Sequence, residues 1–135
     1  METAAKCHKD KRDYPQIKSW GNMTQEILED EFPWFLKAEV KDAEIDYDDG
    51  VLVWEEGFWL DGTWENGVWK DGCWYGGTWK KGIWEDGYWE DGLWESGAWL
   101  GGTWKEGEWK DGYWSNGKIW DKVAKKLIPS EMAPR

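Results

Sequence analysis

Tryptophan recurs every five residues over nearly half of the chain. Thirteen Trp residues stand at unbroken five-residue intervals from Trp54 to Trp114, and a Gly follows each of them at a distance of three, from Gly57 to Gly117. A fixed register of this kind is typical of repeat proteins, in which one small structural unit is copied along the chain. The sequence therefore predicts an array of thirteen Trp-x-x-Gly-x pentads over residues 54–119.

The residue before each of these Gly indicates how one pentad joins the next. It is Asp, Asn or Gly in nine of the thirteen pentads. Asp-Gly and Asn-Gly pairs between strand-forming residues favour type I′ hairpin turns, which need a positive φ at both central positions. Each pentad then divides into a two-residue turn and a three-residue strand with Trp at its centre, so the indoles share one face. The first prediction is an all-β antiparallel meander with Trp on one face.

A second architecture fits the same spacing. A right-handed square β-solenoid, as in pentapeptide-repeat proteins, would place one pentad on each side and point every Trp inward. It would enclose the indoles, whereas a meander is a single-layer sheet that must coil or recruit a cover. Ladder bonds also alternate along an antiparallel strand, so successive three-residue strands cannot close every turn alike. The solenoid therefore stays open as the alternative.

The segment before the array predicts a helix and a pair of strands. Residues 1–18 are mostly polar and are interpreted as a tail. Thr24 precedes the run Gln25–Phe32 and Pro33 follows it, which predicts a short capped helix. Apolar residues then alternate with polar ones, and Asp48-Asp49-Gly50 separates them from the apolar run at 51–53. Residues 19–53 are expected to form an N-terminal cap.

The pentad register ends after Trp114. The next Trp is Trp120, six residues further on. An i, i+3, i+4, i+7 spacing of apolar residues follows and predicts an amphipathic helix. Its members are Trp120, Val123, Ala124 and Leu127. Residues 120–135 are therefore expected to form a C-terminal capping helix and a tail, so that short helices flank the array at both ends.

Length, charge and cysteine content limit the kinds of protein and partner that are expected. The chain has 135 residues, enough for one domain, and its 28 Asp and Glu against 17 Lys and Arg give a formal net charge of -11. This charge disfavours nucleic acid and favours a basic protein as the partner. No apolar run has the length of a signal peptide or membrane span, and two Cys are too few for a disulfide framework. We expect a cytoplasmic protein that does not bind membranes, and the oligomeric state is left open.

The residue after Trp follows a weak pattern that repeats every second pentad and that Glu90 and Lys105 break. Glu occupies this position at Glu55, Glu65, Glu85 and Glu95, whereas Lys occupies it at 70, 80 and 110. In a meander, alternate pentads place this position on opposite edges of the sheet. The four Glu are therefore expected to share one acidic edge, which is the candidate binding site for a basic protein.

Catalytic and metal-binding chemistry is not indicated. The single histidine, His8, lies beside Cys7 in the tail, and the pair lacks the further ligands of a zinc site and the third partner of a nucleophilic triad. The acidic stretch 42–50 fails as a calcium loop, because Ile45 and Tyr47 fall at ligand positions. The carboxylates of the array are evenly spread and offer no distinctive environment for acid-base catalysis. We expect no enzyme activity, cofactor or metal.

Two residue types have both a structural and a functional interpretation. The Trp row is either the core or a platform on which sugars or bases stack, because indole faces serve both purposes. Cys73 stands before Trp74, where other pentads have Thr or Val, and is expected to be a small strand residue rather than a reactive thiol.

Two parts of the array, and the array as a whole, resemble known repeats. The run Trp-Glu-Asn-Gly-Val-Trp at 64–69 resembles designed tryptophan-zipper hairpins, in which an Asn-Gly turn brings two indoles together. Residues 102–112 resemble the Gly-x-Trp-x-x-Gly core of MORN repeats, which form antiparallel hairpins and serve as scaffolds, although the longer MORN period is missing here. The whole array is similar to the tandem Trp-x-x-Gly-x pentad repeats of tailed-phage proteins, a resemblance that implies a phage source and no activity.

Together these observations predict a non-catalytic binding or scaffold protein. The phage resemblance would make it an accessory protein that engages a host macromolecule. The alternatives are a carbohydrate-binding or virion structural module and, with less support from the residues, an enzyme.

Overall fold

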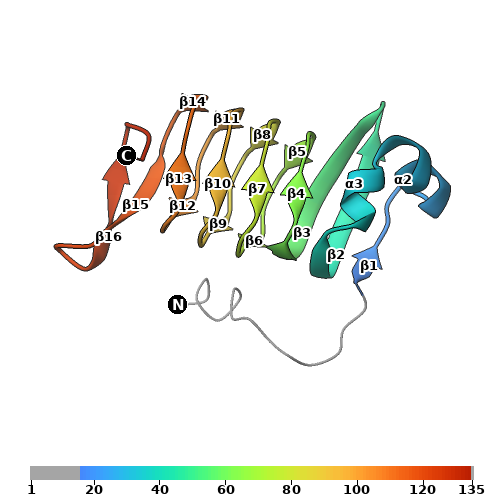
Figure 1. The fold of residues 1–135 in the computed structure, drawn as a ribbon, viewed down its shortest axis with the longest axis horizontal. Coiled ribbons are helices and arrows are strands. Elements are labelled where there is room, and N and C mark those ends of the chain that lie inside the picture. The colour runs from blue at the N-terminus through green and yellow to red at the C-terminus, as the bar shows by residue number, and fades with distance from the viewer. Residues whose placement is uncertain (1–15, 135) are drawn as a thin grey trace.

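Each pentad of the array forms a short strand from its Trp and the residue before it. The computed structural model describes residues 16–134, and these strands run perpendicular to a long axis in Figure 1. They are β4 (Thr63–Trp64), β5 (Val68–Trp69), β6 (Cys73–Trp74), β7 (Thr78–Trp79), β8 (Ile83–Trp84), β9 (Tyr88–Trp89), β10 (Leu93–Trp94), β11 (Ala98–Trp99), β12 (Thr103–Trp104), β13 (Glu108–Trp109) and β14 (Tyr113–Trp114).

These strands pair in parallel with strands three pentads away. Trp54 lies opposite Trp69, which lies opposite Trp84, so one coil of the chain takes three pentads. The pairing creates three columns: β5, β8, β11 and β14; β6, β9, β12 and β15; and β4, β7, β10 and β13. The longer strand β3 (Val51–Asp61) begins the first two columns. The array is therefore a three-sided β-solenoid of four coils and the start of a fifth.

The predicted antiparallel meander is wrong, and the pentad corner explains why. Only Gly adopts a positive φ at a corner, as Gly87 does at 126°, and the described non-Gly residues with positive φ all lie outside the array. Asp86 instead accepts a hydrogen bond from the N–H of Gly87 at 2.8 Å. Such a corner turns the chain through a third of a circle, whereas a type I′ turn reverses it. Three pentads thus close a coil, one fewer than in the square alternative.

Backbone hydrogen bonds join each coil to the next. The N–H of the residue after Trp donates to the Trp carbonyl one coil earlier, as from Lys70 to Trp54 at 2.7 Å. The N–H before Trp donates to a Gly carbonyl, as from Thr78 to Gly62 at 2.9 Å. These bonds run along the solenoid axis, so every interior coil is held by the coils on both sides.

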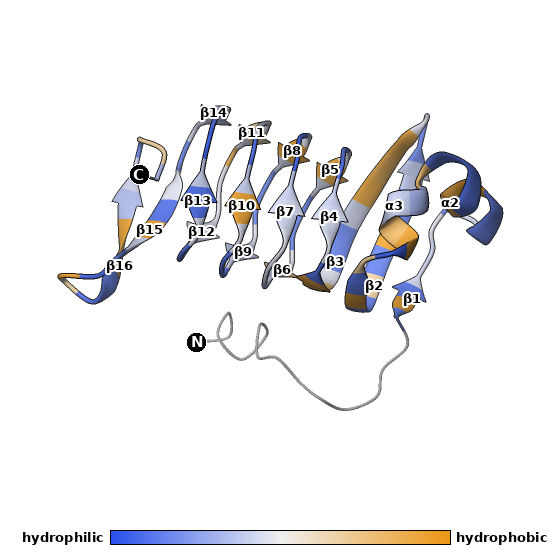
Figure 2. Cartoon of the chain, in the orientation of Figure 1, coloured by the Kyte–Doolittle hydropathy of each residue, from blue (hydrophilic) through white to orange (hydrophobic). Residues whose placement is uncertain are grey.

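The Trp side chains fill the inside of the solenoid. Ten indoles, from Trp54 to Trp99, are fully buried, which confirms that the Trp row is the core. Indoles three pentads apart stack with centroids 4.6–5.0 Å apart and planes within 7°, close to the spacing of strands in a sheet. Neighbouring columns meet edge to face, for example Trp84 and Trp89 at 5.8 Å. In Figure 2, β4 and β7 are pale, whereas β5, β8 and β10 carry orange segments.

The N-terminal segment contains the predicted capped helix and strand pair, but the predicted tail over residues 1–18 is wrong at its end, because Ile17 and Lys18 belong to a strand. Helix α2 (Gln25–Glu31) is capped by Thr24, whose hydroxyl accepts from the N–H of Ile27 at 3.1 Å, and α3 (Pro33–Leu36) follows it. Strand β2 (Glu39–Asp48) pairs antiparallel with β3, and β1 (Ile17–Ser19) pairs in parallel with β2. From α3, Phe35 packs at 6.1 Å from the rings of Trp54 and Trp59. The cap thereby closes one end of the indole stack.

The predicted C-terminal helix is wrong. Strand β15 (Gly117–Asp121) continues the column of β12, and β16 (Lys126–Ser130) pairs antiparallel with it. Ile119 lies opposite Trp104, so it takes the core position, and the one-residue slip turns Trp120 to the outer side. The carboxylate of Asp121 accepts from the N–H groups of Val123 and Ala124, which favours a turn where the apolar spacing predicted a helix.

Candidate functional site

The solenoid presents three outer faces, and each pentad contributes two side chains to one of them. Because side chains alternate along a strand, the residues before and after an inward Trp point outward. We name the faces after their columns: the β4 face (β4, β7, β10, β13), the β5 face (β5, β8, β11, β14) and the β6 face (β6, β9, β12, β15). On one face, the residue before Trp and the residue after Trp therefore come from every third pentad.

The predicted acidic edge is divided between two faces. Glu55 and Glu85 follow Trp54 and Trp84 and lie on the β5 face, with Lys70 between them in the coil that separates them. On the β4 face, the order from coil to coil is Glu65, Lys80, Glu95 and Lys110. The four Glu are not brought together, because the pairing period is three pentads and not two.

This arrangement gives the charge pattern a structural explanation. Like charges directly opposite one another on paired strands are destabilising, and opposite charges contribute roughly 0.2–1 kcal/mol. When Glu and Lys alternate in successive coils, each charge lies opposite a charge of the other sign and not opposite a like charge. The pattern therefore needs no ligand to explain it, and binding by Glu55, Glu65, Glu85 and Glu95 stays a prediction.

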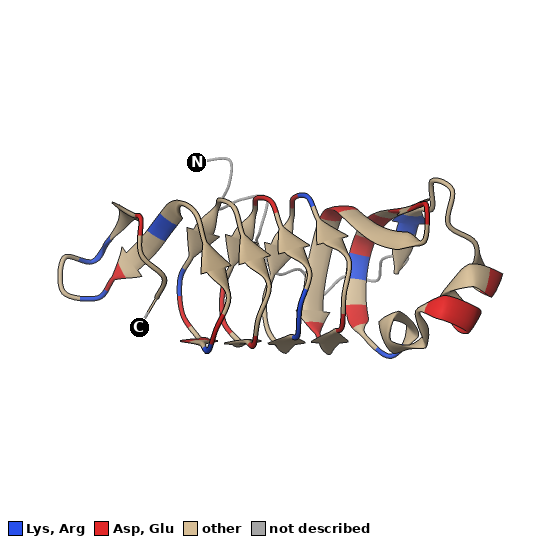
Figure 3. Cartoon of the chain, turned by 90° about the horizontal axis from the view of Figure 1, so that it is seen from above, with Lys and Arg blue, Asp and Glu red and all other residues tan. Residues whose placement is uncertain are grey.

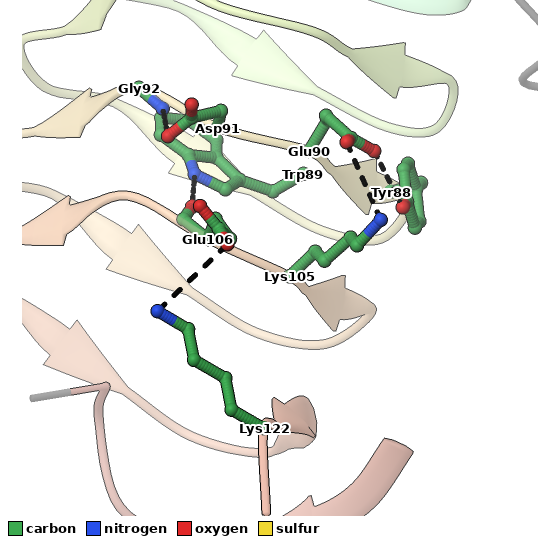
Figure 4. A network of polar contacts seen from close by, with 8 residues as sticks. All are labelled: Tyr88, Trp89, Glu90, Asp91, Gly92, Lys105, Glu106 and Lys122. Atoms are coloured by element: carbon green, nitrogen blue, oxygen red, sulfur yellow. Dashed lines mark hydrogen bonds and ion pairs between the residues drawn. The ribbon is translucent and has the colours of Figure 1, made fainter. Parts of the chain in front are cut away.

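The β6 face is distinguished by aromatic residues and a polar network. Phe58 and Tyr75 lie with nearly parallel rings whose centroids are 6.4 Å apart. Further along the face, Tyr88 donates a 2.7 Å hydrogen bond to Glu90, and the Lys105 ammonium lies 3.6 Å from the same carboxylate (Figure 4).

The two tyrosines of this face hold their protons strongly. Partial burial, reinforced by the nearby Glu90 carboxylate, raises the pKa of Tyr75 to about 12. Burial and the hydrogen bond to Glu90 raise the pKa of Tyr88 as well. Both hydroxyls are therefore neutral hydrogen-bonding groups at neutral pH and are poor candidates for proton abstraction.

Sequence reasoning missed this face, although a signal for it exists. Read at every third pentad, the residues after Trp on the β6 face are Leu60, Tyr75, Glu90, Lys105 and the displaced Trp120. The Lys105 ammonium lies 5.8 Å from the centroid of the Trp120 ring, within the range of a cation-π contact.

Carboxylates gather on the N-terminal cap rather than on a solenoid face. Residues 16–53 contain ten Asp and Glu but three Lys. Figure 3 shows red segments on α2 at one end of the rod and blue segments near the β15–β16 loop at the other. The exposed carboxylates of α2 and of the β2–β3 turn are Glu26, Glu29, Asp30, Glu31, Asp48 and Asp49.

Two contacts fix the geometry of this cap. Asp46 accepts from the N–H groups of Asn22 and Tyr47 at 2.7 and 2.8 Å, and these bonds lower the pKa of its carboxyl. Tyr47 donates to Glu31 at 3.1 Å, which raises the pKa of the phenol. The acidic helix is thus tied to the sheet that closes the solenoid.

Cys73 differs from its expected role in one respect. It is a buried strand residue, 1% exposed, but it is disulfide-bonded. Cys7 and His8, interpreted above as ordinary tail residues, lie outside the described residues. Disulfides are typical of oxidising compartments, so the expected cytoplasmic location stays a prediction.

Residues 16–134 contain no group of three or more His, Cys, Asp and Glu arranged to hold a metal ion. Within the same part of the chain, neither α2 nor α3 has the length and hydrophobicity to cross a membrane. Comparisons with protein-family models, with curated proteins and with solved structures gave no match. The site with the most distinctive chemistry is therefore the acidic N-terminal cap, with the aromatic β6 face beside it.

Proposed function

We propose that this chain is a non-catalytic binding or scaffold protein whose acidic N-terminal cap binds a basic protein. The observation that carries the proposal is the unequal distribution of charge. Residues 16–53 contain seven more carboxylates than lysines, whereas residues 117–134 contain two carboxylates and four lysines. A basic partner is therefore attracted to one end of the rod.

The core supports a scaffold rather than a sugar platform. Binding of sugars by the Trp row requires indole faces open to solvent, and the indoles from Trp54 to Trp99 are fully buried. A stack of coils joined by hydrogen bonds along its whole length is a rigid support for side chains at its end. The resemblance to tailed-phage repeats makes proteins of a phage host the natural place to look for the partner.

The cap acts through many weak contributions. A single exposed carboxylate contributes little to an ion pair in water, but a cluster of like charges accelerates association with an oppositely charged surface. The effect should decrease with added salt, because the Debye length is about 8 Å at physiological ionic strength. The partner's association rate is therefore the informative quantity.

The test compares two variants that remove the same number of charges. Basic proteins are first captured on the full chain from a lysate of the native source or its host and identified by mass spectrometry. The cap variant carries Glu26→Gln, Glu29→Gln, Asp30→Asn and Asp48→Asn, and the matched control carries Glu→Gln at 55, 65, 85 and 95. We expect the cap variant to slow association at low salt about tenfold and the control to slow it far less.

Two results would contradict the proposal. An unchanged association rate in the cap variant at low salt would exclude the cap as the binding surface. Slower association in the control variant alone would identify Glu55, Glu65, Glu85 and Glu95 as the binding site.

A further inference from the structure

A groove lies at the corner between the β4 and β5 faces, beside the N-terminal cap. Its volume is about 230 Å³. Two of its lining residues are the corner glycines of successive coils, Gly67 and Gly82, which have no side chain to fill the space. Its apolar walls come from the cap and from the first residues of β3, β5 and β8, and they are Phe32, Val51, Val68 and Ile83. The orange segments of β5 and β8 in Figure 2 belong to this side of the rod.

The walls of the groove are exposed but held in place. Val51 is 38% exposed and Ile83 is 40% exposed. The N–H of Ile83 donates to the Gly67 carbonyl at 2.9 Å, so this wall is fixed to the coil before it. On the cap side, the ring of Phe32 meets the ring of Tyr47 edge to face at 6.1 Å. A wall that is already ordered loses little entropy when a partner binds, which favours affinity.

The size of the groove indicates what it can hold. Pockets for small molecules usually measure about 300–1,000 Å³, so this groove is too small for most whole ligands. It has room for one large side chain of a bigger partner. A side chain of this kind, inserted in a pocket and surrounded by weaker polar contacts, often contributes much of the binding energy of an interface.

Carboxylates surround the cap end of the groove. Glu31 directly precedes the wall residue Phe32, and Asp48 and Asp49 directly precede Gly50, which also lines the groove. All three carboxylates belong to exposed residues. At the other end, Lys81 precedes Gly82. A partner whose positive charges face the cap is therefore attracted, and one that presents them to the array end is not.

We propose that this groove holds one large apolar side chain of a basic partner, while neighbouring Lys or Arg residues of that partner lie against the carboxylates of the cap. This inference rests on the proposed function and adds to it the kind of segment that is recognised, a cluster of basic residues around a Phe or Leu. The charges of the cap set the association rate, and the inserted side chain slows dissociation.

Two synthetic peptides of equal charge separate the apolar contact from the charge. They are Lys-Lys-Phe-Lys-Lys and Lys-Lys-Ala-Lys-Lys, each acetylated and amidated at its ends. Isothermal titration calorimetry with the full chain at low salt gives the dissociation constant of each peptide. Because burial of a large apolar side chain favours binding, we expect the Phe peptide to bind about tenfold more tightly than the Ala peptide.

The decisive variant changes the walls of the groove without changing its charge. It carries Val51→Ser and Ile83→Ser. The matched control carries Leu100→Ser and Tyr113→Ser, because these two residues also lie on the β5 face and are 42% and 61% exposed. We expect the groove variant to bind both peptides as the wild type binds the Ala peptide, and the control to keep the preference for Phe. Unchanged affinity for the Ala peptide shows that each variant is folded.

The cap variant described above separates this inference from the proposed function. Its lost carboxylates should weaken the binding of both peptides by the same factor and leave the preference for Phe intact. A cap variant that binds both peptides like the wild type would contradict the proposed function. The groove would still be supported if the preference for Phe disappeared in the groove variant alone.

Four results would overturn the assignment of the groove. They are equal affinities of the wild type for the two peptides, a preference for Phe that survives in the groove variant, a preference that is lost in the control, and a failure of both peptides to bind. Sedimentation velocity provides a further check. A wild-type dimer that the groove variant abolishes would assign the groove to a second copy of the chain instead of a basic partner.

Discussion

The dipeptide Asp-Gly builds two different turns in this molecule. At Asp49-Gly50, between β2 and β3, both residues have positive φ, 51° and 85°, and the chain reverses into a hairpin. At Asp86-Gly87, between β8 and β9, only Gly has positive φ, and the Asp carboxylate accepts from the N–H of Gly87. The same two residues thus reverse the chain in one place and turn a corner in the other.

The difference lies in what the flanking residues can pair with. Strands β2 and β3 have ten and eleven residues and pair with each other across the turn. Array strands have two residues, and their partners lie three pentads away in the next coil. A dipeptide therefore permits a turn, and the strands that it connects decide which turn forms.

The largest expected contrast comes from replacing Gly at the two turns. A Cβ on Gly87 would lie 2.5 Å from the carbonyl oxygen of Gly72, at a φ of 126°. We expect Gly87→Ala to lower the free energy of unfolding by at least about 3 kcal/mol. A Cβ on Gly50 meets nothing within 4 Å, so Gly50→Ala should cost about 1–2 kcal/mol, the strain of its positive φ. Equal urea midpoints for the two variants would contradict this account of the corner.

A smaller contrast should come from Asp86. Its carboxylate is the acceptor for the Gly87 N–H, so Asp86→Ala should cost about 0.5–1 kcal/mol. Asp86→Asn keeps a side-chain oxygen at the same place and should recover most of that loss, as Asn66 already does for Gly67 at 2.9 Å. Urea denaturation followed by circular dichroism measures both. If Asp86→Asn were no better than Asp86→Ala, the hydrogen bond would not be what stabilises the corner.

The three-pentad pairing of the array can be tested with charge. Lys80→Glu would place Glu between Glu65 and Glu95 in three successive coils and should cost about 0.5–1 kcal/mol at low salt. Lys81→Glu is the matched control, because it changes the net charge equally and lies between Asn66 and Ser96 in its column. The difference between the melting temperatures of the two variants should shrink with added salt. No difference at low salt would contradict the coil register.

The smallest effect expected is a dependence on alkaline pH. The pKa of Tyr75 is raised to about 12 by burial and Glu90, so its neutral form is favoured in the fold. Its contribution to stability should be complete below about pH 10, the pKa of an unfolded Tyr, and should be lost as the pH rises towards 12. An ultraviolet difference titration of the phenols should lose a step near pH 12 in Tyr75→Phe. A Tyr75 that ionises near pH 10 would contradict this environment.

Sequence reasoning succeeded where a signal acts over a few residues. The first helix was predicted from its capping residue Thr24 and from Pro33, which follows it. The hairpin was predicted from Asp49-Gly50. Each of these signals depends on local backbone geometry. Of the two interpretations of the Trp row, the core was the correct one, since an indole gains most from burial.

The rest depended on contacts between distant residues. The three-pentad period arises from closing three corners. Its clearest trace in the sequence is the alternation of Glu and Lys after Trp along the β4 face and in the first three coils of the β5 face. The acidic edge failed for this reason, since Glu55 and Glu65 lie on different faces. The C-terminal helix failed because pairing with β12 outweighed the spacing of Trp120 and Val123. The disulfide of Cys73 has no local signal.

The direction of the hydrogen bonds between coils has a mechanical consequence. Because they run along the axis, a pull on the two ends of the rod acts on them one coil after another, like opening a zipper. Each coil that detaches frees three pentads of chain, which extend to about 50 Å. Stretched in an optical trap, the molecule should lengthen in even steps of about this size. The solenoid would then absorb a pulling force by extending coil by coil.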